Sequence, residues 1–242
     1  MSVPMPEGNV RPTRREERRA ATVAEIKALA RRQLATAGTG GLSLRGIARE
    51  MRMASAALFR YFDSQADLIT ALCVDAYNSK ADAMESARSK HDSDPAAQWR
   101  AVCIAVREWA LQHPADYALI SGTPLPGYQA QPEQTGPAAA RVVAVLGAAY
   151  LAAVGAGIAD PARTSVHAIS AGPLLASMVP GDAEFDTAVI GIIANAWASI
   201  LGFVSAEVFG SLSALVVDVD ALYDSHIATV MTGMGYQSTV GS

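Results

Sequence analysis

Residues 43–68, SLRGIAREMRMASAALFRYFDSQADL, decide the fold of this chain. Two short segments within this stretch have apolar residues at helical spacing, and these are Leu44, Ile47, Ala48 and Met51 in the first and Leu58, Tyr61 and Phe62 in the second. Ala48 falls where the two helices would cross closely, because a larger side chain would hold them apart. Ser64 precedes Asp67 by three residues, which predicts a capped third helix. The spacing therefore predicts a helix-turn-helix followed by another helix.

The second short segment has an outer face that suits DNA. This face carries Ser55, Ala57, Phe59 and Arg60, in the position that a recognition helix turns toward a groove. Charge supports the interpretation, because residues 1–70 hold 12 Arg or Lys against 7 Asp or Glu. Residues 71–242 hold 7 against 16, so only the N-terminal part of the chain is suited to a polyanion.

The order of these residues resembles the DNA-binding domain of the tetracycline-repressor-like (TetR) family of bacterial transcriptional regulators. The resemblance rests on the pair Ile47-Ala48, the turn at 52–54, the run 58–62 and the helix start at 64–68. Three positions depart from the family pattern. Arg52 stands where the family often has Gly, Ala54 replaces the usual N-cap Ser and leaves Ser55 as the nearest substitute, and Gln65 replaces a Lys. A residue other than Gly in the left-handed backbone conformation costs about 1 kcal/mol. A different backbone conformation of the turn at 52–54 is therefore an alternative.

The expected DNA contacts divide into two kinds. Contacts to the phosphate backbone are expected from Arg14, Arg15, Ser43, Phe59 or Tyr61, and Gln65. Base contacts are expected from Arg45, Ser55, Ala57 and Arg60. Each residue taken singly also has a solvated or structural alternative.

Prolines, glycines and caps divide the rest of the chain into helices, so we expect an all-α fold. Residues 1–12 are expected to be a disordered arm, 13–68 the helix-turn-helix domain, and 69–242 an effector-binding and dimerisation domain. In the last of these, helices are expected from Ser64 toward Lys90, through 99–113 until Pro114 stops the helix, and over 137–157, 160–178 and 187–204. A loop is expected at 122–137, and Asp218 is expected to cap the final helix.

A second stretch carries a related resemblance. Residues 109–117, WALQHPADY, followed by 122–128, GTPLPGY, resemble the C-terminal domain of the TetR branch named for its Trp, His and Gly. The resemblance implies that the last two helices of each subunit form a four-helix dimer interface. The residues expected there are Ile193, Ala194, Trp197, Ala198, Leu201, Leu222 and Val230. The alternative is a helix buried within its own subunit.

Residues 187–204 are also apolar enough to raise the question of a membrane span. A span needs about 20 apolar residues and favours basic anchors, whereas this segment carries Asn195 and is flanked by Asp186 and Glu207. A buried helix explains the segment better, and no membrane partner is expected.

A regulator of this kind needs an effector site in the C-terminal domain. The alkyl-rich composition favours a small hydrophobic ligand. The residues expected to line its site are Trp99, Trp109, His113, Tyr117, Tyr128, His167, Met178 and Trp197. For His113, which precedes Pro114, the alternative is a simple cap at a helix end.

Enzyme chemistry is not expected, because the four histidines are dispersed and none has metal-ligand spacing or a neighbouring nucleophile signature. No cofactor is expected, and Cys73 and Cys103 are expected to be reduced thiols of a cytoplasmic protein. The sequence thus predicts a homodimeric repressor that binds a palindromic DNA operator and is released by its effector. A helical interaction or ligand-binding protein without DNA binding is the alternative, and the uneven charge argues against it.

Overall fold

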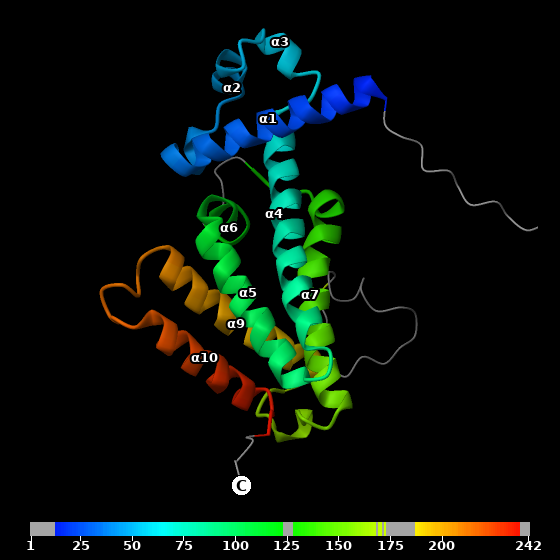
Figure 1. Cartoon of the computed structure of the whole chain (residues 1–242), viewed down its shortest axis with the longest axis vertical. Coiled ribbons are helices and arrows are strands. Elements are labelled where there is room, and N and C mark those ends of the chain that lie inside the picture. The colour runs from blue at the N-terminus through cyan, green and yellow to red at the C-terminus, as the bar shows by residue number, and fades with distance from the viewer. Residues whose placement is uncertain (1–12, 123–127, 168, 171, 173–186, 238–242) are drawn as a thin grey trace, which may run out of the picture. The chain divides into compact units, whose positions relative to one another are not determined.

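The computed structural model describes residues 13–122, 128–167, 169, 170, 172 and 187–237. Every regular element within these ranges is helical, apart from one isolated bridge between Ala159 and Tyr236, so the expected all-α fold is confirmed. The chain forms two compact units, Met1–Leu68 (unit 1) and Ile69–Ser242 (unit 2). Their elements are labelled in Figure 1.

Unit 1 contains α1 (Arg14–Ala37), α2 (Leu44–Glu50) and α3 (Ser55–Leu58). The side chain of Thr13 caps α1 through a capping box with Glu16, and the C-cap of α1 is Gly38, which has a φ of 65°. The core of unit 1 is formed by residues from all its helices and from the segments beside them. These are Ile26, Leu29, Ala30, Leu34, Leu42, Ile47, Ala48, Leu58, Phe62 and Leu68.

The turn between α2 and α3 contains one residue in the left-handed backbone conformation, and this residue is not a glycine. Arg52 has a φ of 54°, so the differently built turn that the sequence left open is not found. Ala54 is the N-cap residue of α3 and makes no side-chain hydrogen bond, so Ser55 does not take over the cap. The expectation that helical structure continues to Phe62 is wrong, because α3 ends at Leu58 and residues 59–61 form turns.

Helix α4 (Gln65–Arg88) begins in unit 1 and continues into unit 2. Its start confirms the predicted cap, because the Asp67 amide donates to Ser64 Oγ at 3.1 Å and Ser64 Oγ donates to Asp67 Oδ2 at 2.9 Å. Unit 2 further contains α5 (Pro95–Gln112), α6 (Pro114–Ser121), α7 (Pro132–Gly155), α9 (Thr187–Val208) and α10 (Val219–Gly233). Asp218 caps α10, as predicted.

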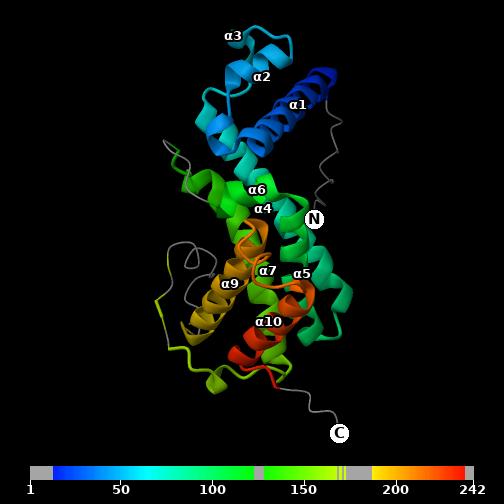
Figure 2. The same cartoon turned by 90° about the vertical axis from the view of Figure 1, so that its left-hand side faces the viewer.

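The core of unit 2 lies among α5, α7, α9 and α10, which Figures 1 and 2 show side by side. Its large buried side chains include Trp99 on α5, Tyr150 on α7 and Tyr223 on α10. The Trp99 and Tyr150 rings meet edge to face with centroids 6.4 Å apart. The Tyr223 hydroxyl donates to the Cys103 carbonyl at 2.7 Å and thereby joins α10 to α5.

The expected stop of α5 before Pro114 is confirmed, but the sequence analysis missed α6, which Pro114 begins at its first position, where proline is favoured. Two other expectations in unit 2 are wrong. Helix α7 begins at Pro132 and contains Pro137, although residues 122–137 were expected to be a loop. A helix over 160–178 is contradicted within the described residues, because only Pro161–Arg163 is helical and residues 164–167 are not.

Two helices, Pro132–Gly155 and Ala188–Val208, are long and apolar enough to cross a membrane by length and composition alone. Core helices of globular proteins pass the same test. Both helices supply buried residues to the core of unit 2, for example Leu146 and Ile192. Only 39% and 44% of the two apolar windows are buried, so packing within the unit covers part of each helix, and the two helices are weak evidence for a membrane span.

Candidate DNA-binding and effector sites

The residues with which we expect unit 1 to contact DNA lie in and around its three helices. The exposed ones are Arg14, Arg15, Ser43, Arg45, Ser55, Phe59, Arg60 and Gln65. Ala57 and Tyr61 are half-buried. The Phe59 ring is 47% exposed although it is large and apolar, which sets it apart from the neighbouring Leu58 and Phe62 of the core. An exposed aromatic ring beside exposed guanidinium groups suits contact with a nucleic-acid backbone.

The start of α2 is fixed by two hydrogen bonds from the segment that precedes it. Ser43 Oγ accepts from the Gly46 amide at 3.1 Å, which caps the helix. The Ser43 amide donates to Gln33 Oε1 at 2.9 Å, so α1 holds the same residue from the other side. Ser43 therefore sets where α2 begins, and its hydroxyl is already engaged in the cap.

Arg19 of α1 holds the segment that follows α3. Its Nη1 donates to the Arg60 carbonyl at 3.2 Å, and its guanidinium carbon lies 5.1 Å from the centroid of the Tyr61 ring. By sequence alone, Arg19 is one of several arginines near the start of α1. Its positioning role depends on a contact between residues far apart in the chain, and no local pattern reports such a contact.

The expected effector-site residues are dispersed in unit 2. Trp99 belongs to the core, and His113 and His167 are exposed. His113 stacks on Trp109 with centroids 5.5 Å apart, and its Nδ1 lies 3.0 Å from the Trp109 carbonyl oxygen, which agrees with the helix-end alternative. The Tyr128 hydroxyl lies 3.1 Å from Thr70 Oγ1. Met178 lies outside the described residues.

Three of the expected residues do come together, around a side chain that the sequence did not single out. Lys80 of α4 is 1% exposed, and its Nζ lies 5.8 Å from the Trp109 ring centroid, 5.7 Å from that of Tyr117 and 4.5 Å from that of Trp197. We call these four residues the Lys80 cluster. Burial lowers the pKa of Lys80 from 10.5 to about 7. A lysine within a helical sequence normally extends into solvent, so nothing local indicated this position.

Hydrogen bonds fix two rings of the cluster. Trp109 Nε1–H donates to Ser79 Oγ at 3.0 Å. The Tyr117 hydroxyl donates to the Leu201 carbonyl at 3.3 Å and lies 2.7 Å from Ser205 Oγ. Burial raises the pKa of Tyr117, so the ring stays neutral at physiological pH. The cluster thus has rigid aromatic walls and one ionisable amine.

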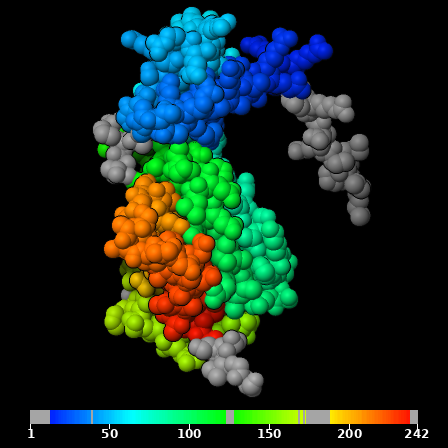
Figure 3. Space-filling view, turned by 60° about the vertical axis from the view of Figure 1, so that its left-hand side comes forward, coloured from blue at the N-terminus to red at the C-terminus, as the bar shows by residue number. Residues whose placement is uncertain are grey.

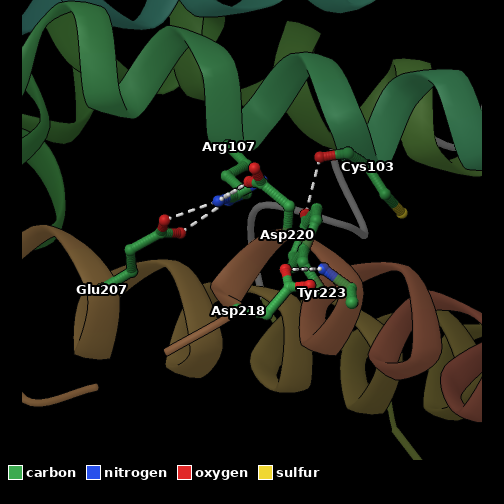
Figure 4. A network of polar contacts seen from close by, with 7 residues as sticks. Cys103, Arg107, Glu207, Asp218, Asp220 and Tyr223 are labelled. Atoms are coloured by element: carbon green, nitrogen blue, oxygen red, sulfur yellow. Dashed lines mark hydrogen bonds and ion pairs between the residues drawn. The ribbon is translucent and has the colours of Figure 1, made fainter. Parts of the chain in front are cut away.

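A partly buried ion-pair network joins α5, α9 and α10 (Figure 4). Arg107 of α5 donates to Glu207 of α9 through Nε and Nη2, at 2.6 Å each, and to Asp220 of α10 at 2.6 Å. The side chains of Arg107 and Glu207 are only 15% and 14% exposed. The hydrogen bonds to Glu207 are the main reason that the pKa of Arg107 is raised. The network fixes the last two helices against α5.

The residues expected at a dimer interface differ in exposure. Ala194, Ala198 and Leu222 are exposed, Trp197 and Leu201 are half-buried, and Ile193 and Val230 belong to the core of unit 2. The segment after α9 adds Phe209, Leu215 and Val217, which are 52%, 78% and 105% exposed. In Figure 3 the orange segment that joins α9 to α10 lies on the surface of unit 2.

Among the residues for which side chains are described, no group of three or more His, Cys, Asp or Glu is arranged to hold a metal ion. Cys73 and Cys103 are both free and buried. Burial raises the pKa of each thiol.

Comparison with known proteins agrees with the two units. Residues 26–72 match the family model described as bacterial regulatory proteins, tetR family. Residues 99–230 match the model described as tetracyclin repressor-like, C-terminal domain. The chain is 37% identical over 221 residues to the HTH-type transcriptional regulator Rv1816 of Mycobacterium tuberculosis. This match covers 88% of this chain and 92% of that protein.

Solved structures give the same result. The crystal structure of the putative regulatory protein SCO4313 has a TM-score of 0.71 and 32% identity, and the match covers 91% of this chain and 100% of the other. A protein of unknown function from Rhodococcus sp. RHA1 has a TM-score of 0.67 and 24% identity, covering 88% and 95% of the two chains. The second likeness shows the fold alone.

Proposed function

The chain belongs to the TetR family of bacterial transcriptional regulators, and we propose that it is a cytoplasmic, ligand-responsive repressor. In this proposal a homodimer binds a palindromic operator, and a small hydrophobic effector bound in unit 2 releases the DNA. The family consists of regulators and not of enzymes, so in this proposal the protein acts by binding and releasing DNA.

One observation carries the proposal, namely the helix-turn-helix of unit 1 with its exposed aromatic and basic residues. Ser55 begins α3, and Phe59 and Arg60 follow its end, all three exposed. Arg60 can pair in a bidentate manner with guanine, and Ala57 can contact a thymine methyl group. The basic start of α1, with Arg14 and Arg15, can neutralise phosphates without reading sequence.

Dimerisation is supported by the surface of α9, α10 and the segment between them. Small residues such as Ala194 and Ala198 allow close helix approach, and Leu222 adds an exposed apolar side chain. An apolar surface of this kind marks a protein–protein interface. Two-fold symmetry of the protein would then require a palindromic operator with half-sites about 34–36 Å apart or a multiple of that spacing.

The position of α4 in the chain supports control of DNA binding by an effector. This helix begins directly after the helix-turn-helix and carries Lys80 into the aromatic cluster of unit 2. A ligand that moves α4 would change the spacing of the two DNA-binding heads. A tenfold loss of operator affinity needs only about 1.4 kcal/mol of coupling, which is ordinary for allosteric proteins.

The test is an electrophoretic mobility shift of DNA from upstream of the chain's own gene, measured over a range of salt concentrations. Arg60→Ala and Arg45→Ala should each weaken specific binding by about 1–3 kcal/mol while leaving binding to random DNA nearly unchanged. Replacing Arg14 and Arg15 together should weaken binding to all sequences and flatten the salt dependence.

Arg163→Ala is the matched control, because Arg163 is an exposed arginine of unit 2. This variant should bind like the native protein. Equal losses on operator and random DNA for every variant of unit 1 would overturn the assignment of base readout. A native protein that shifts no DNA at low salt would overturn the proposed function.

A further inference from the structure

The Lys80 cluster leaves a buried positive charge incompletely compensated. Three aromatic rings face the Lys80 ammonium at 4.5–5.8 Å. Among the described residues, the contacts found for Lys80 Nζ are those with the three rings, and burial is the cause of its lowered pKa. Ring faces attract a cation, but they supply neither a hydrogen-bond acceptor nor a counter-charge for the ammonium group.

Burying the Lys80 ammonium group without a counter-ion is energetically unfavourable, so we expect a ligand to supply that counter-ion. A buried lysine without a counter-ion is rare in proteins. With a pKa of about 7, Lys80 is still half protonated at neutral pH and can gain its full charge when an anion arrives. A bound carboxylate would supply the missing acceptor and counter-charge together.

The three aromatic rings of the Lys80 cluster indicate the chemistry of the rest of the ligand. Trp109, Tyr117 and Trp197 come from α5, α6 and α9, and each presents an aromatic ring toward the amine. Flat apolar walls favour an aromatic or aliphatic body. Trp197 is half-buried, whereas Lys80, Trp109 and Tyr117 are buried. A cationic ligand, which aromatic cages often bind, would be repelled by Lys80.

We propose that Lys80 anchors a binding site for a monocarboxylate with an apolar body, and that this class of compound is the effector. The inference rests on the proposed regulatory function and makes it more specific, since sequence composition indicated only a hydrophobic ligand. Because Lys80 lies on α4, the ion pair would form on the helix that leads from the DNA-binding unit.

The test is isothermal titration calorimetry at pH 7 with matched probes. These are phenylacetate, 4-phenylbutyrate, octanoate and decanoate, each beside its primary amide. The native protein should bind at least one carboxylate about tenfold or more tightly than its amide, a difference of about 1.4 kcal/mol. Lys80→Met should lose this preference, because the thioether keeps the length of the side chain without its charge.

Lys90→Met is the matched control, since Lys90 is exposed in the short 3₁₀ helix Ser89–His91 that follows α4. This variant should keep the native preference. Lys80→Gln is a second variant, and circular dichroism of both Lys80 variants establishes that they are folded. A native protein that prefers none of the carboxylates, or a folded Lys80→Met or Lys80→Gln variant that keeps the preference, would overturn the site.

A mobility-shift titration with the preferred carboxylate separates the two proposals. Release of DNA by the carboxylate but not by its amide is expected. If the native protein shifts DNA but shows no carboxylate preference, the inference about Lys80 fails and the proposed function stands. If the carboxylate binds at Lys80 and DNA affinity does not change, the effector role is wrong. If no DNA is shifted at all, the proposed function fails on its own.

Discussion

At the scale of single residues, Arg52 bears a conformational cost that a glycine would avoid. Its φ of 54° lies in the left-handed region, and its side chain is exposed. Replacing Arg52 with Gly should therefore raise the free energy of unfolding by about 1 kcal/mol, because glycine has no Cβ to clash in this conformation. Chemical denaturation followed by circular dichroism measures the change.

Arg49→Gly is the matched control for that experiment. Arg49 is also an exposed arginine, but it lies within α2, where glycine should cost about 1 kcal/mol relative to a good helix former. The two Arg→Gly substitutions should thus shift stability in opposite directions. Destabilisation by Arg52→Gly would mean that the arginine makes a compensating interaction in this turn.

At the scale of elements, the partly buried network around Arg107 should matter more than its exposed counterpart around Arg141. Arg107→Ala should cost about 2 kcal/mol of stability, because it leaves the half-buried Glu207 carboxylate without its guanidinium partner. Arg141 pairs with Asp82 and Glu85 at a largely exposed site, so Arg141→Ala should cost at most about 1 kcal/mol. Thermal denaturation of the two variants compares them directly.

A double-mutant cycle strengthens this comparison. Glu207→Ala in the Arg107→Ala background should restore part of the lost stability, since it removes the unpaired carboxylate. Equal losses from Arg107→Ala and Arg141→Ala would show that the partly buried network does not hold α9 and α10 against α5.

The helices also show how much of the fold could be predicted from the sequence. The helix starts at Ser64 and Asp218 were predicted correctly, because capping depends on a few adjacent residues. Pro114 and Pro132 were interpreted only as breaks, although each begins a helix at its first position. The Lys80 cluster could not be predicted, because it exists only where four helices from distant parts of the chain meet.

At the scale of the whole molecule, a charge placed on the exposed face of α9 should prevent dimerisation. Ala198→Glu is expected to give monomers that keep their helix content and lose operator affinity, because each head alone makes only half of the contacts. Analytical ultracentrifugation at micromolar concentration measures the change in mass.

Ala144→Glu provides the matched substitution on α7, where Ala144 is also exposed. This variant should remain a dimer. A native protein that sediments as a monomer at micromolar concentration would contradict the dimer proposal, and a dimeric Ala198→Glu variant would place the interface elsewhere.

The two buried cysteines have a practical consequence for spectroscopy. Maleimides and methanethiosulfonates react with thiolates, and burial keeps both native thiols protonated and covered. Thr36→Cys would place a reactive thiol at an exposed position of α1. Each subunit could then carry a single spin label without removal of the native cysteines. Electron-spin distance measurements between the two labels of a dimer would report directly whether a bound carboxylate changes the separation of the heads.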